Sequence, residues 1–204
     1  MKQRKLVVIS AGLSQPSSTR LLADQLSAAA GRAAAQLGVT AEVQVIELRD
    51  LAHEITDHML TGFPPAALKS AQDAVAAADG LIVVTPVFSA SYSGLFKSFF
   101  DVLEQDTLGD KPILLAATAG TARHSLVLEH ALRPLFAYLH AVPVPTSVFA
   151  ASDDWGANSV EGPLRGRIER AATELAREME RREPATVADP FALTESFEDM
   201  MKSL

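Results

Sequence analysis

Short apolar runs alternate along this chain with longer segments whose apolar residues recur every three or four positions, and this alternation constrains the fold most. Apolar runs of about four to eight residues are typical of strands that are buried on both faces. A helical segment between two such runs supplies the crossover that parallel strands require. The alternation therefore predicts an α/β domain in which helices cover both faces of a parallel sheet.

Five apolar runs are predicted to form strands, and five segments of helical periodicity are predicted to form helices. The strands are expected at residues 5–10, 42–48, 80–85, 112–117 and 143–149. The helices are expected at residues 18–37, 65–78, 94–104, 127–139 and 164–179. We expect a loop over 49–64, and we expect Pro134 to kink its helix or to remove one hydrogen bond. The last strand contains prolines, so it is expected at the sheet edge.

The pattern predicts one doubly wound domain over residues 1–183, with the five strands in the order 2-1-3-4-5. Its length of 204 residues suits one domain with a small appendage, at about 150 residues per domain. Residues 184–190 are predicted to be a linker, followed by a short amphipathic C-terminal tail up to residue 204. The tail is expected to pack on its own domain or on a twin subunit, or to dock another protein.

Composition excludes several classes of function. The chain has no cysteine, which excludes disulfides, thiolate nucleophiles and cysteine-ligated metals. Its net charge of -7 argues against a nucleic-acid partner. No apolar run approaches the ~18 residues of a membrane span, and the run after the basic start is too short for a signal peptide. The five histidines form no metal-ligand spacing. We expect a cytoplasmic protein without a metal, nucleic-acid or membrane partner.

The loop after the first predicted strand, residues 10–20 (SAGLSQPSSTR), has the features of a phosphate site. It carries five hydroxyl side chains and opens directly into a helix, whose first amides favour an anion. It lacks the spacing of a dinucleotide fingerprint and of a Walker A loop. The alternative is a serine-rich turn that only caps the helix.

Two further loops follow the third and fourth predicted strands, which should neighbour the first at the point where the strand order reverses. Residues 85–94 (TPVFSASYSG) contain two aromatic side chains that suit stacking on a flat ligand. Residues 118–125 (TAGTARHS) contain Gly120, which lets backbone approach a ligand closely. The alternatives are aromatics that cover the sheet end and an ordinary turn. Together the three loops favour a ligand with a terminal phosphate and a planar heterocycle, and FMN fits that description.

Three segments, SAGLSQPSSTR, TPVFSASYSGLFKSFFD and TAGTARHSLVLEHALRPLF, resemble those of the NADPH-dependent FMN reductases. The resemblance covers about residues 5–180 and is closest to the actinobacterial-type FMN reductases that serve luciferase-like monooxygenases. It implies a flavodoxin-like fold, FMN as cofactor, and NADPH or NADH as hydride donor. It also implies a homodimer or homotetramer and a flavin-dependent monooxygenase as partner.

The resemblance assigns roles to residues of the three loops. The FMN phosphate is assigned to the first loop, at Ser10, Gly12, Ser14, Ser17, Ser18, Thr19 and Arg20. The isoalloxazine ring is assigned to the second, at Pro86, Val87, Phe88, Ser89, Ser91 and Tyr92. The pyrimidine end is assigned to the third, at Thr118, Ala119, Gly120 and Thr121, with Arg123 or His124 near the ring's N1–O2 edge or the nicotinamide nucleotide. The stretch 10–13 departs from the Gly-Ser-then-Arg start of many members.

No catalytic side chain is predicted, because N5 of the flavin accepts the hydride. Three phenylalanines in the helix over 94–104 exceed what one face needs against a sheet, which favours a subunit interface there. Trp155 and its neighbours are expected to fold over the site or a partner, or to be solvated. Three alternatives stay open: an FMN-holding reductase of quinones, azo dyes or metal oxyanions, a flavodoxin-type electron carrier, and a phosphate-binding protein without flavin.

Overall fold

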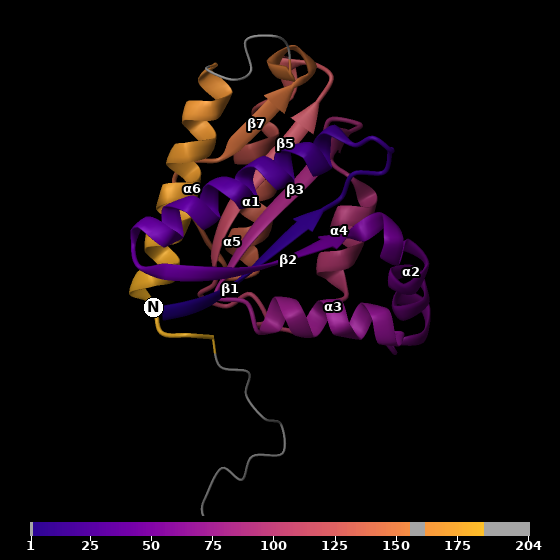
Figure 1. Cartoon of the computed structure of the whole chain (residues 1–204). Coiled ribbons are helices and arrows are strands. Elements are labelled where there is room, and N and C mark those ends of the chain that lie inside the picture. Colours follow the sequence, from indigo (N-terminus) through magenta and orange to yellow (C-terminus); the bar gives the residue numbers. More distant parts are fainter. Residues whose placement is uncertain (1, 156–161, 186–204) are drawn as a thin grey trace, which may run out of the picture.

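The computed structural model describes residues 2–155 and 162–185, which form a seven-stranded sheet between two layers of helices (Figure 1). The parallel strands are β1 (Lys2–Ser10), β2 (Val39–Glu47), β3 (Gly80–Phe88), β5 (Pro112–Ala119), β6 (Val142–Pro143) and β7 (Val148–Ala151). Their order is β2-β1-β3-β5-β6, and β7 also pairs with β5. The short β4 (Ser91–Tyr92) runs antiparallel to β3. The predicted doubly wound, flavodoxin-like sheet is confirmed.

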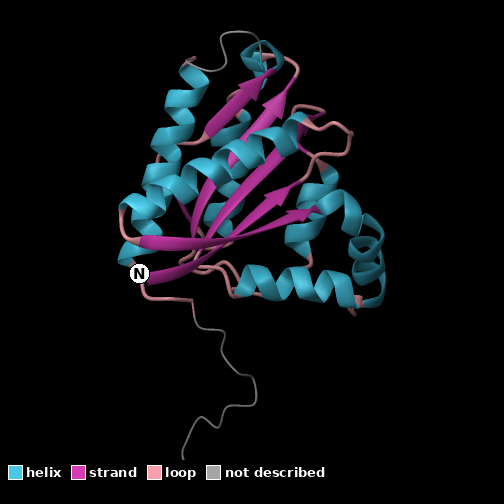
Figure 2. Cartoon of the chain, viewed as in Figure 1, coloured by secondary structure: helices cyan, strands magenta, loops and turns pink. Residues whose placement is uncertain are grey.

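The helices lie on both faces of the sheet (Figure 2). They are α1 (Ser18–Gln36), α2 (Ala52–Thr61), α3 (Ala66–Ala76), α4 (Gly94–Asp101), α5 (Arg133–Tyr138) and α6 (Pro163–Arg181). Helices α1 and α6 pack together over one face, in the core cluster that contains Leu6 and Val8. The other four contribute to the core cluster that contains Val7 and Ile9. Successive residues of a strand point to opposite faces, so one apolar run supplies both cores.

The predicted fifth strand is present in two short pieces. Both β6 and β7 pair with β5, and residues 144–147 separate them. Pro145 has no N–H to give to a ladder, so the ladder is interrupted at this point. The edge position that its prolines predicted is therefore confirmed, although the strand is not continuous.

The prediction of a loop over residues 49–64 is wrong. A 3-10 turn (Leu48–Leu51) leads there into α2, which ends at Gly62 in the left-handed conformation with φ 77°. Apolar periodicity does not detect α2, because Ile55 is its only buried residue. The helix lies at the margin of the helical layer and leaves most of its surface to solvent.

Pro134 alters its helix as predicted, by way of a π turn. Residues Leu128–Leu132 form this turn, and Arg133 donates its N–H to the carbonyl of Leu128, five residues earlier. A proline in a regular helix clashes with the carbonyl four residues before it, and the wider π spacing relieves that clash. Helix α5 then begins with the proline in its first turn, where no N–H is needed.

The three phenylalanines of α4 lie inside the chain's own core and not at its surface. Phe96, Phe99 and Phe100 are at most 2% exposed. The rings of Phe96 and Phe100 lie 4.8 Å apart, and both rings contact Phe136 of α5. They fill the space between α4, α5 and the sheet. The prediction that these three side chains form a subunit interface is therefore wrong.

Two predictions concern the ends of the domain and its relation to membranes. Pro184 and Ala185 are described, and the Ala185 N–H donates to Asp79 at 2.8 Å. The remainder of the predicted linker and the whole tail, residues 186–204, lie outside the described residues. Within the described part of the chain, no helix is both long and apolar enough to span a membrane.

Candidate functional site

A pocket of about 320 Å³ lies at the carboxyl ends of β1, β3 and β5, where the three predicted loops meet. Parallel strands present these ends at one edge of the sheet, so loops far apart in sequence converge there. The lining residues are Gly12, Leu13, Ser14, Ser18, Thr19, Pro86, Val87, Phe88, Thr118, Ala119, Gly120 and Ser152. This pocket is the candidate functional site.

The start of α1 forms one wall of the pocket. The Ser17 hydroxyl caps the helix by accepting from the Arg20 N–H at 3.2 Å. Gly12 lies against this cap, and a Cβ at that position would sit 2.0 Å from the Ser17 Oγ. The loop can therefore fold this closely on the helix only because residue 12 has no side chain. The first amides of a helix favour an anion, and Ser14 and Ser18 line the pocket beside this helix start, so the arrangement suits an anionic group.

Two buried threonines join the first loop to the third. Thr19 and Thr118 share a hydrogen bond of 2.8 Å between their hydroxyl oxygens. Thr19 belongs to the first turn of α1 and Thr118 to the end of β5, and both line the pocket. The bond holds the helix start and the strand end at a fixed separation, which positions the pocket walls.

Replacing Thr118 by valine is expected to lower the free energy of unfolding by about 1–3 kcal/mol, because it leaves the buried Thr19 hydroxyl without a partner. The double variant T19V/T118V removes donor and acceptor together, so it is expected to be more stable than T118V alone. Urea unfolding of the wild type, both single variants and the double variant measures this. Additive losses in the double variant would contradict the proposed pairing.

Ser10 and Arg20, both assigned to the phosphate, are not among the residues that line the pocket. The Ser10 hydroxyl is buried and has no hydrogen-bond partner among the described residues. Arg20 forms ion pairs with Asp24, at 2.8 Å, and with Glu47 of β2. Its hydrogen bond to Asp24, more than any other contact, raises the pKa of Arg20 above its ordinary value. The guanidinium is therefore held by carboxylates of the protein itself.

The second loop is a tight hairpin between β3 and β4. Its two turn residues, Ser89 and Ala90, have φ of 48° and 69°, and a two-residue turn with positive φ at both positions matches the twist of the strands. Phe88 lines the pocket and is 46% exposed. Tyr92 instead packs on Phe96, with ring centroids 5.9 Å apart. Of the two aromatics predicted to stack on a ligand, only Phe88 lies in the pocket wall.

The third loop contributes Thr118, Ala119 and Gly120 to the wall. Its next residue, Thr121, uses its hydroxyl to accept from the Arg123 N–H at 3.4 Å, which caps a short 3-10 turn. Arg123 and His124 belong to that turn and do not line the pocket. The described structure therefore does not place the side chain of Arg123 or His124 in the pocket wall, where the sequence led us to expect a positive charge near the flavin ring.

Ten of the residues assigned from the sequence line the pocket, and the other eight do not. Those outside the lining are Ser10, Ser17, Arg20, Ser89, Ser91, Tyr92, Thr121 and Arg123. Leu13 and Ser152 line the pocket and were not assigned. Ser152 directly follows β7, which pairs with β5. Its position after the carboxyl end of a further parallel strand is the sequence signal that could have placed it in the pocket.

Trp155 does not cover the pocket. It is half-buried and packs against the core cluster under α1 and α6. Its neighbour Asp154 accepts from the Ala151 N–H at 2.7 Å and so ends β7 in a 3-10 turn (Ser152–Trp155). The described part of this segment therefore shapes the end of the edge strand, and Ser152 is its one residue in the pocket lining.

The lining offers hydroxyls, backbone amides and one aromatic ring. None of the twelve lining residues is an acid, a base or a histidine. Within residues 2–155 and 162–185, no group of three or more His, Cys, Asp or Glu side chains could hold a metal ion. The residues suit the binding of an uncharged ring with a phosphate, and the bound group itself must supply any redox chemistry.

Comparison with known proteins yields consistent matches. The family described as NADPH-dependent FMN reductase matches residues 4–156. An FMN reductase (NADPH) of Pseudomonas aeruginosa is 39% identical over 84% of this chain and 90% of its own length. The NADH-dependent FMN reductase SfnF of Pseudomonas fluorescens has the same identity and coverage. The X-ray structure of an oxidoreductase from Corynebacterium diphtheriae has a TM-score of 0.84 and 49% identity, over 90% of this chain and all of that chain.

Proposed function

The chain belongs to the NADPH-dependent FMN reductase family and is an NAD(P)H-dependent oxidoreductase of FMN, and we propose that it releases the reduced flavin to a two-component monooxygenase. The observation that carries the proposal is the pocket at the carboxyl ends of β1, β3 and β5, whose lining residues in the described part of the chain include no acid or base. Such a site binds and orients a redox group and leaves hydride transfer to that group.

The first loop suits the phosphate of FMN. Gly12 and Ser17 keep the loop close to the start of α1, and the hydroxyls of Ser14 and Ser18 lie in the pocket. Helix amides and hydroxyls together bind a phosphate without a lysine or arginine. This explains how a chain of net charge -7 can bind a doubly charged group.

The second and third loops suit the flavin ring. Pro86, Val87 and Phe88 supply an apolar wall, and residues 118–120, at the end of the neighbouring strand β5, line the pocket beside them. When it is bound, FMN supplies the hydride-accepting atom, N5. The side chains of this chain position the ring and leave one aromatic neighbour, Phe88, partly in solvent.

Exposure of the pocket supports a flavin that exchanges with solution. Phe88 is 46% exposed although it lines the pocket, so this wall adjoins bulk water. A ring that stacks on Phe88 can therefore enter from solution and return to it directly at this wall. Release of the reduced flavin is what supply to a second protein requires.

A two-chamber experiment tests the release. The enzyme, FMN and NADH or NADPH are placed anaerobically in one chamber, and ferricytochrome c in the other, behind a membrane that passes FMN but no protein. We expect the cytochrome to be reduced only when both enzyme and FMN are present, because free reduced flavin must cross the membrane. Oxidised cytochrome at saturating FMN would contradict release and favour an enzyme that holds its flavin and reduces quinones, azo dyes or metal oxyanions.

We also propose that the chain is a homodimer or homotetramer. Leu60 of α2 and Phe63 after it are 81% and 79% exposed, and Met59 beside them is also exposed. Adjacent large apolar side chains on a surface are typical of an interaction site. Light scattering should give at least twice the chain mass of 21.7 kDa, and a 21.7 kDa particle at working concentration would contradict the proposal.

A further inference from the structure

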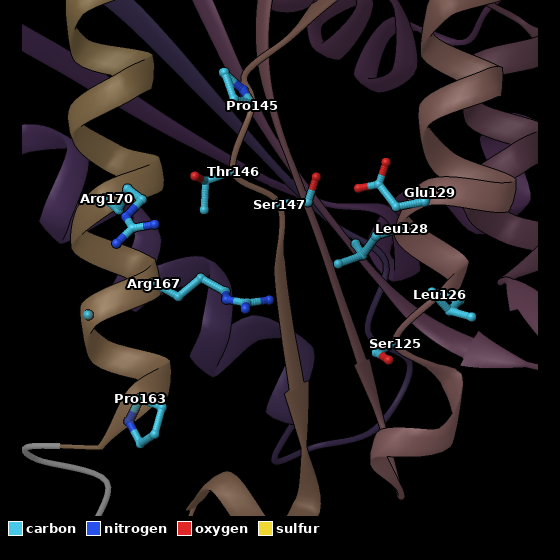
Figure 3. A pocket seen from close by; sticks show the side chains of 11 residues that line it. Ser125, Leu126, Leu128, Glu129, Pro145, Thr146, Ser147, Pro163, Arg167 and Arg170 are labelled. Atoms are coloured by element: carbon cyan, nitrogen blue, oxygen red, sulfur yellow. The ribbon is translucent and has the colours of Figure 1, made fainter.

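A groove of about 620 Å³ lies at the edge of the sheet that β6 and β7 form (Figure 3). Helix α6 forms one wall, the π turn and the residues before it form the other, and the segment between β6 and β7 forms the floor. Its described lining residues are Ser125, Leu126, Leu128, Glu129, Pro145, Thr146, Ser147, Pro163, Gly166, Arg167 and Arg170. None of them lines the flavin pocket, so the two cavities have separate walls in the described part of the chain.

One side of α6 is directed at the groove. Pro163, Gly166, Arg167 and Arg170 occupy positions i, i+3, i+4 and i+7 of the helix, which lie on one face. Figure 3 shows Arg167 extending from α6 toward the floor, with Arg170 on the same wall. Neither guanidinium has a hydrogen bond or an ion pair with a described residue.

The acids around the groove already have partners. Glu129 is bound by Arg133 at 2.7 and 3.1 Å. Glu169 of α6 forms an ion pair of 2.7 Å with an arginine of α1. Glu174, farther along α6, accepts from the N–H and the hydroxyl of Thr146 at 2.7 and 2.8 Å. Two guanidinium groups in a concave site therefore remain for an anion from solution.

The two guanidinium groups suit a phosphate better than a carboxylate. A guanidinium is a planar fork that binds a phosphate or a carboxylate through two parallel hydrogen bonds. Side chains three residues apart on a helix begin about 5–6 Å from each other, so both forks can reach one group or two linked groups. A single carboxylate satisfies one fork, whereas a dianionic phosphate or a diphosphate satisfies both.

The remainder of the groove suits an organic body attached to that phosphate. Cavities of roughly 300–1,000 Å³ hold ligands of the size of a small drug, so this volume exceeds what a phosphate alone needs. The Thr146 hydroxyl donates to Glu174 and can still accept, and the Ser147 hydroxyl accepts from Arg133 at 3.0 Å and can still donate. Leu126, 62% exposed, adds apolar surface.

Gly166 keeps this volume open. A Cβ at this position meets open space, so no close contact in the described structure requires a glycine there. Glycine is also a poorer helix former than alanine, and this one lies inside a helix of 19 residues. A larger side chain on this face of α6 would project into the groove beside the two arginines.

We propose that this groove binds a phosphate ester of about the size of a nucleotide, with its phosphate between Arg167 and Arg170. The hydroxyls of Thr146 and Ser147 meet its polar groups, and Leu126 packs against its apolar part. The site is separate from the flavin pocket, so its occupation does not depend on how flavin is held or released.

Calorimetric titration with ADP, a nucleotide without a flavin ring, tests the site in the full chain. We expect a dissociation constant below about 1 mM for the wild type. In R167Q/R170Q it should rise at least about tenfold, because hydrogen bonds between charged groups are lost. Arg177→Gln is the matched control, since Arg177 is an exposed arginine of the same helix that does not line the groove. It should bind ADP like the wild type.

Filling the groove gives a second variant that keeps both arginines. In Gly166→Leu the new side chain occupies the groove, and ADP binding should weaken at least about tenfold. Its thermal midpoint should not fall, because leucine is a better helix former than glycine. Gly31→Leu places the same side chain on α1, where a Cβ also meets open space, and should leave ADP binding unchanged.

Each variant should bind FMN with the wild-type dissociation constant, because none of the changed residues lines the flavin pocket. The KM for NADH separates two sources of the ligand. A KM that rises in R167Q/R170Q together with the ADP dissociation constant identifies the adenosine end of the hydride donor, and an unchanged KM identifies a separate phosphate ester. No binding by the wild type at about 1 mM ADP, wild-type binding by R167Q/R170Q or G166L, or a parallel loss of FMN binding would overturn the proposal.

Discussion

Replacing Gly12 by alanine is expected to raise the dissociation constant for FMN roughly 100-fold, through loss of the helix cap and distortion of the phosphate loop. The added Cβ would sit 2.0 Å from the Ser17 Oγ and 3.1 Å from the Thr19 Cβ. Either the Ser17 hydroxyl leaves the Arg20 N–H or the loop moves away from α1. Both changes displace the helix amides to which we assign the phosphate. Quenching of FMN fluorescence during titration with protein measures the constant.

Two controls separate this steric effect from general damage. Gly31→Ala on the same helix places its Cβ in open space and should leave FMN binding unchanged. In the double variant G12A/S17A the shortest clash is gone, so FMN should bind more tightly than to G12A alone. If G12A binds FMN like the wild type, the first loop does not hold the phosphate. If S17A does not relieve G12A, distortion of the loop is not the cause, and loss of the Ser17 cap accounts for the weaker binding.

Replacing Phe96 by alanine is expected to lower the free energy of unfolding by about 3–5 kcal/mol, because it empties a fully buried site in the core. The ring of Phe96 contacts those of Tyr92, Phe100 and Phe136. Its removal therefore loosens both α4 and the hairpin between β3 and β4, to which Tyr92 belongs. Urea unfolding followed by circular dichroism measures the loss. Phe88→Ala, at a half-exposed phenylalanine, should cost at most about 1 kcal/mol.

Protein concentration distinguishes a core role from an interface role for Phe96. A side chain buried within its own chain contributes the same free energy at any concentration, whereas an interface side chain acts through association. The difference between wild type and F96A should therefore stay constant over a hundredfold range of dilution. A difference that disappears on dilution would restore the subunit interface that the three phenylalanines of α4 first indicated.

The strand order and the place of the site could be predicted from sequence because both depend on strongly apolar strands. Residues 80–85 and 112–117 are buried on both faces, and their carboxyl ends necessarily meet at one edge of the sheet. Helix α2 could not be predicted in the same way. Only Ile55 is buried there, so its apolar pattern carries too little information.

Within the site, residue type predicted the loops better than the orientation of individual side chains. Arg20 has the right charge for a phosphate, but Asp24 and Glu47 hold its guanidinium elsewhere. Tyr92 has the right shape for stacking, but Phe96 offers it a partner inside the core. Such competition between partners depends on the tertiary structure, and a single sequence does not display it.

The dependence of NADH and NADPH oxidation on added FMN tests the account most directly. Initial rates are measured as FMN is raised from zero to saturation, for the wild type and for G12A. We predict a negligible rate without FMN and a hyperbolic rise with it, and a half-saturating concentration for G12A that increases with its FMN dissociation constant. A rate that is independent of added FMN, or no oxidation of either nucleotide, would contradict a reductase that takes FMN as an exchanging substrate in this pocket.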